Sequence, residues 1–410
     1  MSQLSQNSRL VRIKTPLPVD TFIVTALDGE EAVSNDFHFE LSLLSNDHAI
    51  KHTDLLGKAV TISIYTEGDS KCRYINGYVN NLRMLDVNDD GLRGYQISVV
   101  SGLWFTSLNS ENRVFQEQSA KDIIEQVLSH YASVLKVDFS LNGTVLNREY
   151  CVQFDETDFE FVHRLLAEEG ISYYFEHKDG EHKIKFIDDA QAFFDCDVDP
   201  LDYDGGGSQP TRNSIHRWER SFAFHTGGVE TTDYSEFATT NTYKSSVSTS
   251  STLNAASSYK MKHFGIYRFK PDQDPKHAFE SSDNTHRATS ILEAEEGQHD
   301  TAVGTSDSGQ LCSGGRFTIE HPISSEAGDY TITRLRLTAR EGNGRDTFFE
   351  NEFECVPSGK IVRPIWRFPP KTIDAPQVAT VEEVKATASD SSQDTFCLLY
   401  TSDAADEAKC

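Results

Sequence analysis

The sequence of 410 residues lacks the segments that send a chain into or through a membrane. No apolar run approaches the roughly 20 residues of a membrane-spanning helix. The first residues, MSQLSQNS, do not join a basic segment to an apolar one, so they do not have the pattern of a secretory signal peptide. We therefore expect a chain made in the cytoplasm without a membrane span, which leaves the cell only by a route that needs no signal peptide.

Cysteine occurs without a pattern. The seven cysteines are scattered, odd in number and free of C-x-x-C spacing, so neither a disulfide framework nor a zinc site is indicated. We expect free buried thiols. They are Cys72, Cys151, Cys196, Cys312, Cys355, Cys397 and Cys410.

The chain has fewer basic than acidic residues. The 38 basic residues face 64 acidic ones, which gives a net charge of −26. This sign repels phosphate backbones and anionic lipids, so we expect no nucleic-acid partner and no electrostatic binding to a membrane surface. A hydrophobic content of 37% with 10% aromatic residues nevertheless indicates folded domains, and the length allows two or three.

The motifs of common enzyme classes are also missing. There is no G-x-S-x-G elbow, H-E-x-x-H helix, Walker loop or dinucleotide fingerprint. Gly205–Gly207 lacks the lysine and the helix of a phosphate-binding loop, and Asn142-Gly143-Thr144 is explained by a turn. The sequence predicts no catalytic residue, no cofactor and no metal.

Two groups of titratable residues are candidate sites. The carboxylates Asp155, Glu156, Asp158, Glu160, Glu168 and Glu169 could supply the acid and base of a glycosidase. Acidic residues in a first helical turn are explained by the helix dipole, so a structural role is favoured. Glu168 and Glu169 lie at the unfavourable C-terminal end, where a cation from a neighbouring subunit would balance them.

His177 and His182 form the second group, on either side of the Asp179-Gly180 turn. A two-residue hairpin loop places them opposite each other, where two imidazoles could hold a metal. Without a third ligand nearby, we expect an exposed polar pair instead.

The stretch from Arg148 to Glu176 carries the clearest pattern in the chain. Tyr150 to Phe154 alternate as in a half-buried strand. Thr157 and Glu160 form a capping box, which predicts that a helix begins there. Glu160 also precedes Arg164 by four residues, the favourable orientation for an ion pair.

The predicted helix covers residues 158–169 and stops at Gly170, a residue that tolerates the left-handed conformation. A strand over 171–175 and a hairpin to 182–187 follow. The apolar side of the helix consists of Phe159, Val162, Leu165 and Leu166.

This stretch resembles the signature of the VgrG family, the trimeric spikes of type VI secretion systems, and of related hub proteins of contractile phage tails. The family run is similar to R-E-Y-x-V-Q-Y-x-E-[ST]-D-x-x-F-[IV]-x-R-L-[LM]-E-E-E-G-I-x-Y-[YF]-F-x-H, which the chain follows through to His177. The signature residues, with an implied structural role, are Arg148, Glu149, Tyr150, Val152, Gln153, Asp158, Phe161, Arg164, Leu165, Glu168, Glu169, Gly170, Ile171, Tyr173 and Phe175.

The regions on both sides read mainly as strands. We predict strands over Thr21–Thr25, Phe37–Leu44, Ala59–Tyr65, Tyr74–Leu85 and Tyr95–Val100, and later over Ile215–Phe224, Phe317–Ile319, Tyr330–Thr338 and Thr347–Val356. Turn signals are Asp28-Gly29, Asn76-Gly77 (or a bulge there) and Asp90-Gly91. Helices are expected near 119–136, capped by Ser119, and over Ser290–Glu296, and a mobile loop over Asn241–Ser258.

The resemblance implies a mainly β (α+β) fold with tandem antiparallel β-barrel hub domains and an inserted helix–hairpin unit, phage tail hub-like. We expect a first hub barrel at 1–105, a helix and hairpin unit at 106–200, a second hub barrel at 208–365 and the start of an OB-fold at 366–394. Asp204 to Pro210 reads as the flexible junction between the last unit and the second barrel.

The implied function is that of a non-enzymatic hub that forms a homotrimer and docks on the Hcp tube hexamer. A PAAR-type tip protein and effectors would bind through regions beyond those present, and type VI secretion would carry the protein out of the cell. A contractile phage tail or tailocin hub remains an alternative, and a tail-associated cell-wall hydrolase a second one. Because the family's needle also contributes trimer contacts, we expect this chain alone to be mostly monomeric.

The last residues depart from the family. Cys397 to Glu407 resemble the translation of a transposase adapter used in preparing sequencing libraries. We expect 395–410 to be a non-native, disordered tail in which Cys397–Tyr400 has no strand partner, and 370–394 to be a lone OB-fold strand.

Overall fold

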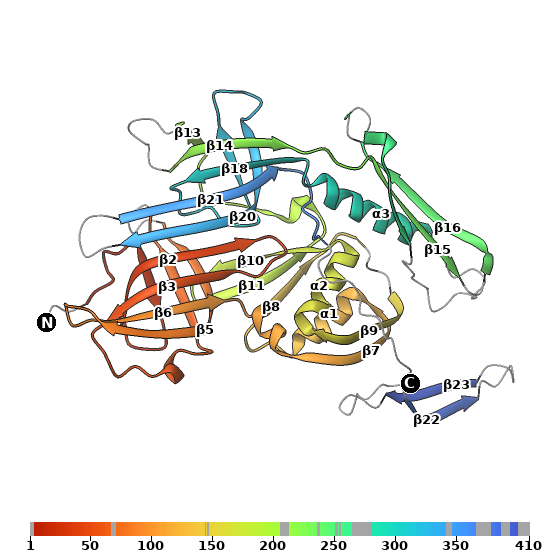
Figure 1. The fold of residues 1–410 in the computed structure, drawn as a ribbon, viewed down its shortest axis with the longest axis horizontal. Helices are drawn as coiled ribbons and strands as arrows, with labels where there is room; N and C mark the ends of the chain where they lie inside the picture. Colours follow the sequence, from red (N-terminus) through yellow and green to blue (C-terminus); the bar gives the residue numbers. More distant parts are fainter. Residues whose placement is uncertain are drawn as a thin grey trace.

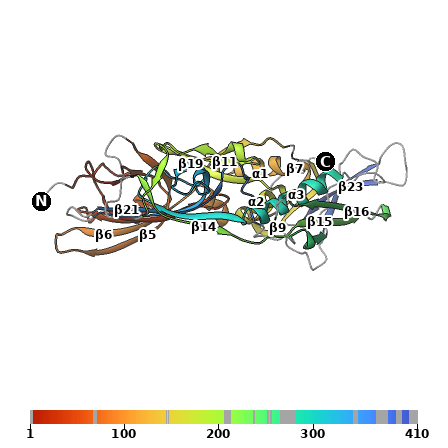
Figure 2. The same cartoon turned by 90° about the horizontal axis from the view of Figure 1, so that it is seen from above.

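The computed structural model describes residues 4–66, 71–143, 145, 147–205, 213–235, 238–250, 253, 256–264, 281–341, 347–365, 379–386 and 394–400. Figure 1 shows an elongated molecule with β-rich regions around a central helical unit. Seen from above, α1, α2 and α3 all lie in the half away from the N-terminus (Figure 2). No helix in the described ranges is long and apolar enough to cross a membrane.

The first barrel region is an antiparallel ladder in the order β1-β4-β5-β6-β3-β2. Its strands are β1 (Val11–Lys14), β2 (Ile23–Ala32), β3 (His38–Ser45), β4 (Ala59–Ile64), β5 (Arg73–Val87) and β6 (Arg93–Val100). Burial alternates along β3, where Phe39, Leu41 and Leu43 point into the core. A short 3-10 turn, His52–Asp54, lies between β3 and β4, and another, Leu103–Leu108, follows β6.

Two of the three predicted turns in this region are wrong. Asp90-Gly91 does connect β5 to β6, with Gly91 at a φ of 77°. Asp28-Gly29 and Asn76-Gly77 instead lie inside β2 and β5. A Cβ on Gly29 would lie 2.0 Å from the Phe39 ring, so this glycine marks close packing between strands.

The helical unit follows. It contains β7 (Ser110–Ser119), α1 (Ala120–Ser129), β8 (Lys136–Ser140), β9 (Asn147–Thr157), α2 (Asp158–Glu169), β10 (Ser172–Lys178) and β11 (Glu181–Ile187). β7 and β9 form an antiparallel ribbon, and β10, β11 and β8 form a small sheet in which β8 runs parallel to β11. The predicted α2 is confirmed at both ends.

The predicted helix at 119–136 is too long. Ser119 caps α1 as expected and accepts the Asp122 N–H at 3.1 Å. The helix ends at Ser129, however, and residues 130–134 form turns before β8 begins. The Tyr131 N–H donates to the Leu128 carbonyl and the Val134 N–H to the Tyr131 carbonyl, so turns replace the last part of the predicted helix. β8 pairs with β11 from Lys136 onward.

The second barrel region closes on itself. Its strands are β12 (Phe194–Asp195), β13 (Leu201–Tyr203), β14 (Ser214–Phe222), β18 (Asp300–Ser306), β19 (Gly315–Glu320), β20 (Gly328–Glu341) and β21 (Thr347–Pro357). The ladder β20-β21-β18-β14-β13-β19 returns to β20, which completes a ring. β2 also pairs with β20, so both regions share one sheet. The predicted mainly β architecture is confirmed, although the second ring is mixed, because β13 pairs in parallel with both β14 and β19.

A side arm leaves the second barrel (Figure 1). It consists of β15 (Gly228–Ser235), β16 (Ala238–Ser248), the 3-10 turn Ala256–Ser258, β17 (Met261–Phe264) and α3 (Ser281–Glu296). The predicted loop at Asn241–Ser258 is therefore wrong up to Ser248, because β16 pairs with β15 and contacts α3. Its serines and threonines form a strand because Val247 packs on the cluster of Val229 and Leu292. The predicted helix at Ser290–Glu296 is the end of α3.

Near the C-terminus, β22 (Ala379–Ala386) pairs with β23 (Asp394–Tyr400) as an antiparallel hairpin. This corrects the expectation of a lone strand at 370–394 and of Cys397–Tyr400 without a partner. Two strand-forming stretches so close in sequence pair locally. Residues 401–410 of the expected tail, and most of the expected OB-fold entry, lie outside the described residues.

Candidate functional site: an ion network between β9 and α2

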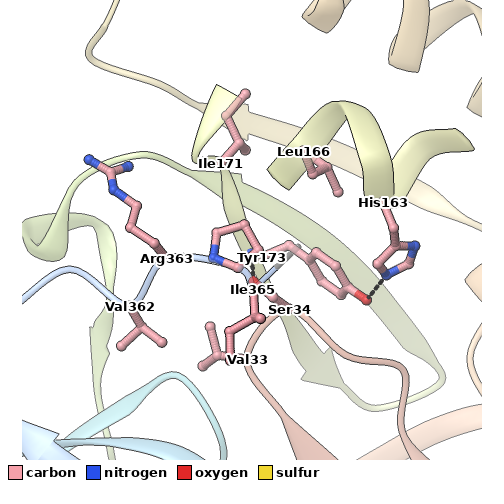
Figure 3. A pocket seen from close by; sticks show the side chains of 10 residues that line it. Val33, Ser34, His163, Leu166, Ile171, Tyr173, Val362, Arg363 and Ile365 are labelled. Atoms are coloured by element: carbon pink, nitrogen blue, oxygen red, sulfur yellow. Dashed lines mark hydrogen bonds between the residues drawn. The ribbon is translucent and has the colours of Figure 1, made fainter. Parts of the chain in front are cut away.

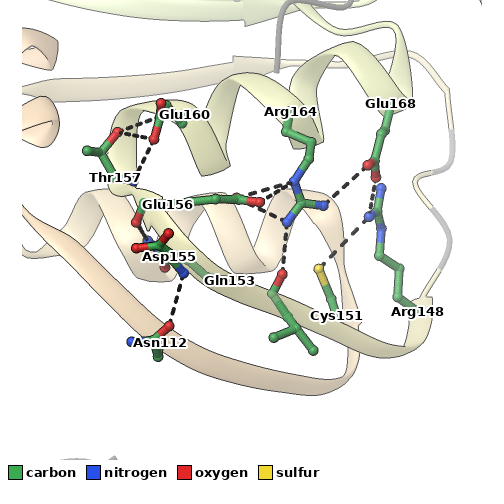
Figure 4. Close-up of polar contacts among 11 residues, drawn as sticks. Asn112, Arg148, Cys151, Gln153, Asp155, Glu156, Thr157, Glu160, Arg164 and Glu168 are labelled. Atoms are coloured by element: carbon green, nitrogen blue, oxygen red, sulfur yellow. Dashed lines mark hydrogen bonds and ion pairs between the residues drawn. The ribbon is translucent and has the colours of Figure 1, made fainter. Parts of the chain in front are cut away.

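Helix α2 is fixed at both ends by its own residues (Figure 4). Thr157 Oγ1 accepts the Glu160 N–H at 3.1 Å, and the Glu160 carboxylate accepts the Thr157 N–H at 2.9 Å. At the other end Gly170 adopts a φ of 69°. The predicted capping box and stop are thus present, and they set the helix that carries the network.

Arg164 is the centre of the network (Figure 4). Its Nε donates to Glu156 Oε1 at 3.0 Å, and its Nη2 donates to the Val152 carbonyl at 2.8 Å. Nη1 lies 3.3 Å from Glu168 Oε1. The predicted Glu160–Arg164 pair is not formed, because Glu160 is held by the cap and Arg164 turns under the helix toward β9.

Arg148 balances the two carboxylates at the end of α2. Its Nη1 donates to Glu168 Oε2 at 2.5 Å and its Nη2 to Glu169 Oε1 at 2.6 Å. Arg287 of α3 adds a donor to the Glu168 carbonyl at 2.5 Å. The cation expected from a neighbouring subunit is therefore supplied within this chain, and by a residue of the same signature.

A third part of the network surrounds Asp158, the first residue of α2, which is fully buried. Arg113 of β7 pairs with its carboxylate. Gln153 Nε2 and the Tyr131 hydroxyl donate to it at 2.9 and 2.7 Å. Asp158 thereby ties α2 to both strands of the ribbon and to the turn after α1.

These contacts explain which face of β9 is buried. The predicted alternation is present, but Gln153 is fully buried while Tyr150 is 49% exposed. Cys151 shares the buried face with Gln153. The polar network occupies the inner side of the ribbon. The buried face of β9 is therefore the one that carries Cys151 and Gln153, and not the face of the apolar Tyr150. The local sequence pattern does not predict the contacts of Gln153 with Asp158 and Arg113.

The electrostatics favour a structural role for the network. Burial by itself raises the pKa of the Glu168 carboxyl, but the Arg148, Arg287 and Arg164 guanidiniums together lower it to about 2. The pKa of Arg148 is lowered by its own burial, yet Glu168 and Glu169 raise it well above the ordinary value. Charges held this way stay ionised at neutral pH and cannot exchange protons as a general acid must.

Five further signature residues are buried around this network. Glu149 lies on β9, and Val152 is half-buried. The buried ones are Phe161, Leu165, Ile171, Tyr173 and Phe175.

A cavity of about 130 Å³ lies beside this core, between α2, β10 and the segment after β21 (Figure 3). His163 and Tyr173 meet at its edge, with the hydroxyl 2.8 Å from Nε2. Arg363 secures the segment by donating to the Gly170 carbonyl at 2.6 Å and pairing with Glu293 at 2.7 Å. The chain after the second barrel thus returns to the helical unit.

The histidine pair differs from expectation. His177 and His182 do lie opposite each other across the Asp179-Gly180 turn. They are not exposed, because the hairpin packs against the first barrel. His177 Nδ1 accepts the Asn76 N–H at 3.1 Å, and His182 Nε2 accepts the Gly102 N–H at 3.0 Å.

Both imidazoles are held neutral. Burial lowers the pKa of His182 to about 4. The pKa of His177 is lowered well below its ordinary value, first by burial and then by the nearby His182 and Arg73. The ring of Phe37 lies 5.3 and 5.9 Å from the two imidazoles, centre to centre. In the part of the chain that the structure describes, no group of three or more His, Cys, Asp and Glu could hold a metal ion.

The sequence matches a profile of the phage tail baseplate hub (GPD) family over residues 30–343. It is 27% identical over 394 residues to the type VI secretion system spike protein VgrG1c of Pseudomonas aeruginosa. That alignment covers 92% of this chain and 51% of the relative. The chain thus spans about half the length of the curated relatives it matches.

Solved structures with a similar fold include the c3393 protein of E. coli, described as a type VI secretion component similar to bacteriophage T4 tail proteins. The TM-score is 0.65 at 18% identity, covering 91% of this chain and 84% of the other. A 43 kDa tail protein of prophage MuSo2 from Shewanella oneidensis gives 0.56 at 13% identity, covering 85% and 98%.

Proposed function

The chain belongs to the phage tail baseplate hub (GPD) family, and we propose that it is the hub-forming part of a type VI secretion spike. Three copies form a hub that docks on the hexameric Hcp tube and takes part in puncturing target cells and delivering effectors. A PAAR-type tip protein and effectors join the same spike. The secretion system itself carries the protein to the exterior or into the target cell.

The observation that carries this proposal is the extent of the similarity to a spike protein, which runs over 92% of the chain rather than over the signature alone. The proposed hub comprises a first barrel at 1–105, the helical unit at 106–200 and a second barrel at 208–365, to whose sheet the preceding short strands β12 and β13 are also paired. An OB-fold starts at 366–394, and residues 395–410 are a non-native tail. The role needs no catalytic step, which agrees with the ion pairs that the carboxylates of Glu156, Glu168 and Glu169 form with arginines.

The test is a deletion of the gene that encodes this chain in its own host. We expect Hcp to disappear from the culture supernatant while its level inside the cells is unchanged, and a plasmid copy to restore export. A matched plasmid copy carrying Arg334→Met, a change at an exposed ion pair, should restore export equally. Unchanged Hcp export in the deletion strain would refute the secretion role.

The alternative, a hub of a contractile phage tail or tailocin, is supported by the likeness of the fold to the prophage tail protein. The same deletion strain separates the two functions. If the chain belongs to a tail, treatment with mitomycin C should yield no contractile particles from the deletion strain, whereas Hcp export should continue. A secretion spike gives the opposite pair of results.

A further inference from the structure

Two cysteines that are 116 positions apart meet where the helical unit joins the second barrel. Cys196 directly follows β12, and Cys312 lies in the turn before β19. β12 pairs with β19 in parallel, with Phe194 opposite Gly315. The Cys196 N–H donates to the Arg316 carbonyl at 2.8 Å, and the Gly315 N–H donates to the Cys312 carbonyl at 3.1 Å. The hydrogen-bonded ends of β12 and β19 therefore hold the two cysteines close together.

The two sulfurs converge on the space beside Gly315. A Cβ added to this glycine would lie 2.3 Å from Cys196 Sγ and 3.5 Å from Cys312 Sγ. The Cys196 sulfur thus occupies the volume that a side chain at position 315 would fill, and the Cys312 sulfur lies in contact with the edge of that volume. A disulfide needs two cysteines whose side chains point toward each other at short range, and this arrangement meets that condition.

The surroundings favour a thiolate at Cys196 and a protonated thiol at Cys312, whose pKa the Cys196 contact and burial raise well above its ordinary value. Arg73 is buried and pairs with Glu31 at 2.7 Å, while its Nη1 has no hydrogen-bond partner among the described residues. Glu31 also accepts the Ser313 N–H at 2.6 Å, so the turn that carries Cys312 is anchored to the first barrel. A hydrogen bond from the Cys312 thiol, against the effect of burial, lowers the pKa of Cys196, and Arg73 adds to this.

We propose that Cys196 and Cys312 are a disulfide-forming pair, which a low-molecular-weight disulfide converts into a covalent link between the end of β12 and the turn before β19. The partly exposed Cys312 thiol loses its proton, and its sulfur attacks one sulfur of the small disulfide, forms a mixed disulfide and releases one thiolate. The Cys196 thiolate then attacks Cys312 Sγ, forms the protein disulfide and expels the second thiolate. The two thiol protons pass to the released thiolates, so two protein thiols are oxidised and one small disulfide is reduced to two thiols.

Access and consequence both follow from the fold. Cys312 is partly exposed, which opens the pair to a small reagent, whereas Cys196 is buried. The link closes a loop that contains β13 to β18 and the side arm. Cross-linking so long a loop restricts the unfolded chain and stabilises the folded one. The proposal does not depend on the secretion role, because it rests on contacts within one chain.

The test treats the full chain with hydroxyethyl disulfide, blocks the remaining thiols with iodoacetamide and maps the peptides by mass spectrometry without reduction. We expect a linked peptide pair that contains Cys196 and Cys312, and a melting temperature raised by roughly 5 °C or more that dithiothreitol reverses. Cys196→Ser and Cys312→Ser should each abolish the link and the rise. Cys72→Ser, which alters a half-buried thiol elsewhere, should retain both.

A second variant tests the geometry. Gly315→Ala places a methyl group where the two sulfurs meet, so we expect the link to form at least about ten times more slowly. The wild-type chain alone can overturn the proposal, whether or not the variants fold. If its circular dichroism is native and Cys196 and Cys312 remain alkylated, or are linked to other cysteines, the pair is not a disulfide site.

Discussion

Two buried polar clusters lie on the same helical unit, and they remain buried by opposite means. In the network under α2, charged groups face charged groups, and Arg164 and Glu156 are both about 95% or more buried. At the turn of the β10–β11 hairpin, His177 and His182 instead remain neutral among aromatic rings. The first cluster joins the parts of the unit to one another. The second joins the unit to the first barrel.

The difference between the two clusters shows how the protonation chemistry of a side chain determines what partners it needs when it is buried. A guanidinium cannot lose its proton, so it stays buried only beside carboxylates. An imidazole can lose its proton, and then a single backbone N–H is enough to satisfy its free nitrogen. The ion network should therefore depend strongly on each partner and little on pH near neutrality. The histidine pair should show the reverse behaviour.

The largest effect is expected from Arg164→Met, which keeps the length of the side chain but removes its charge. Glu156 loses the cation that lies 3.0 Å away, and the Val152 carbonyl loses a donor. We expect a loss of about 3–5 kcal/mol in the free energy of unfolding at pH 7, measured by urea denaturation.

Two controls sharpen this prediction. Arg334→Met breaks an ion pair with Glu30 in which both side chains are largely exposed, and it should cost less than about 1 kcal/mol. The double variant Arg164→Met/Glu156→Leu should recover much of the loss, because no buried charge is then left alone. Equal losses for Arg164→Met and Arg334→Met would contradict the importance assigned to the network.

The second effect appears only on acidification. The pKa of His182 is about 6.5 in the unfolded chain and about 4 in the folded one. The unfolded state therefore binds more protons between these values, so stability falls as pH drops from about 6.5 to about 4. The full contribution of His182 is about 3 kcal/mol. His182→Gln should remove this part of the pH dependence while its amide still accepts the Gly102 N–H.

This comparison has to be made between variants, because burial raises the pKa of Asp36 to about 6 and makes its contribution change in the opposite direction. The exposed His38, beside Glu40, offers a matched control. The urea midpoint should fall between pH 7 and pH 4.5 by the same amount in wild type and His38→Gln, and by less in His182→Gln. If His182→Gln loses as much stability on acidification as wild type, His182 is not the residue that senses pH.

Local patterns predicted the parts of the helical unit that are decided within a few residues. The capping box at Thr157, the stop at Gly170 and the Asp179-Gly180 turn each depend on neighbours in sequence, and each is present. The histidines of that turn were placed opposite each other correctly. Their burial was missed because Phe37 and Gly102, which enclose them, are about 80 or more positions away.

The other errors have the same cause. Asp28-Gly29 has the composition of a turn, but the Phe39 ring on the neighbouring strand needs the space that this glycine leaves. Ser- and Thr-rich β16 has the composition of a loop, but α3 covers it from about 40 positions further along. Glu168 and Glu169 were recognised as an unusual pair, whereas Arg148 as their partner required the three-dimensional structure.

The smallest loss in the free energy of unfolding is expected at the helix caps. They are purely local interactions and therefore serve as a comparison for the ion network. Thr157→Ala removes the acceptor for the Glu160 N–H at 3.1 Å, and Ser119→Ala removes the same contact for Asp122 at 3.1 Å. Each should cost about 1 kcal/mol in urea denaturation. Ser119 Oγ also donates to Asp122 Oδ2 at 2.6 Å, whereas Thr157 Oγ1 lies 3.2 Å from Glu160 Oε2, so Ser119→Ala should be the more costly of the two. Because Arg164 still anchors the middle of α2 to β9, the loss in Thr157→Ala should remain well below that in Arg164→Met. If the two losses were equal, the cap rather than the ion network would determine where α2 lies.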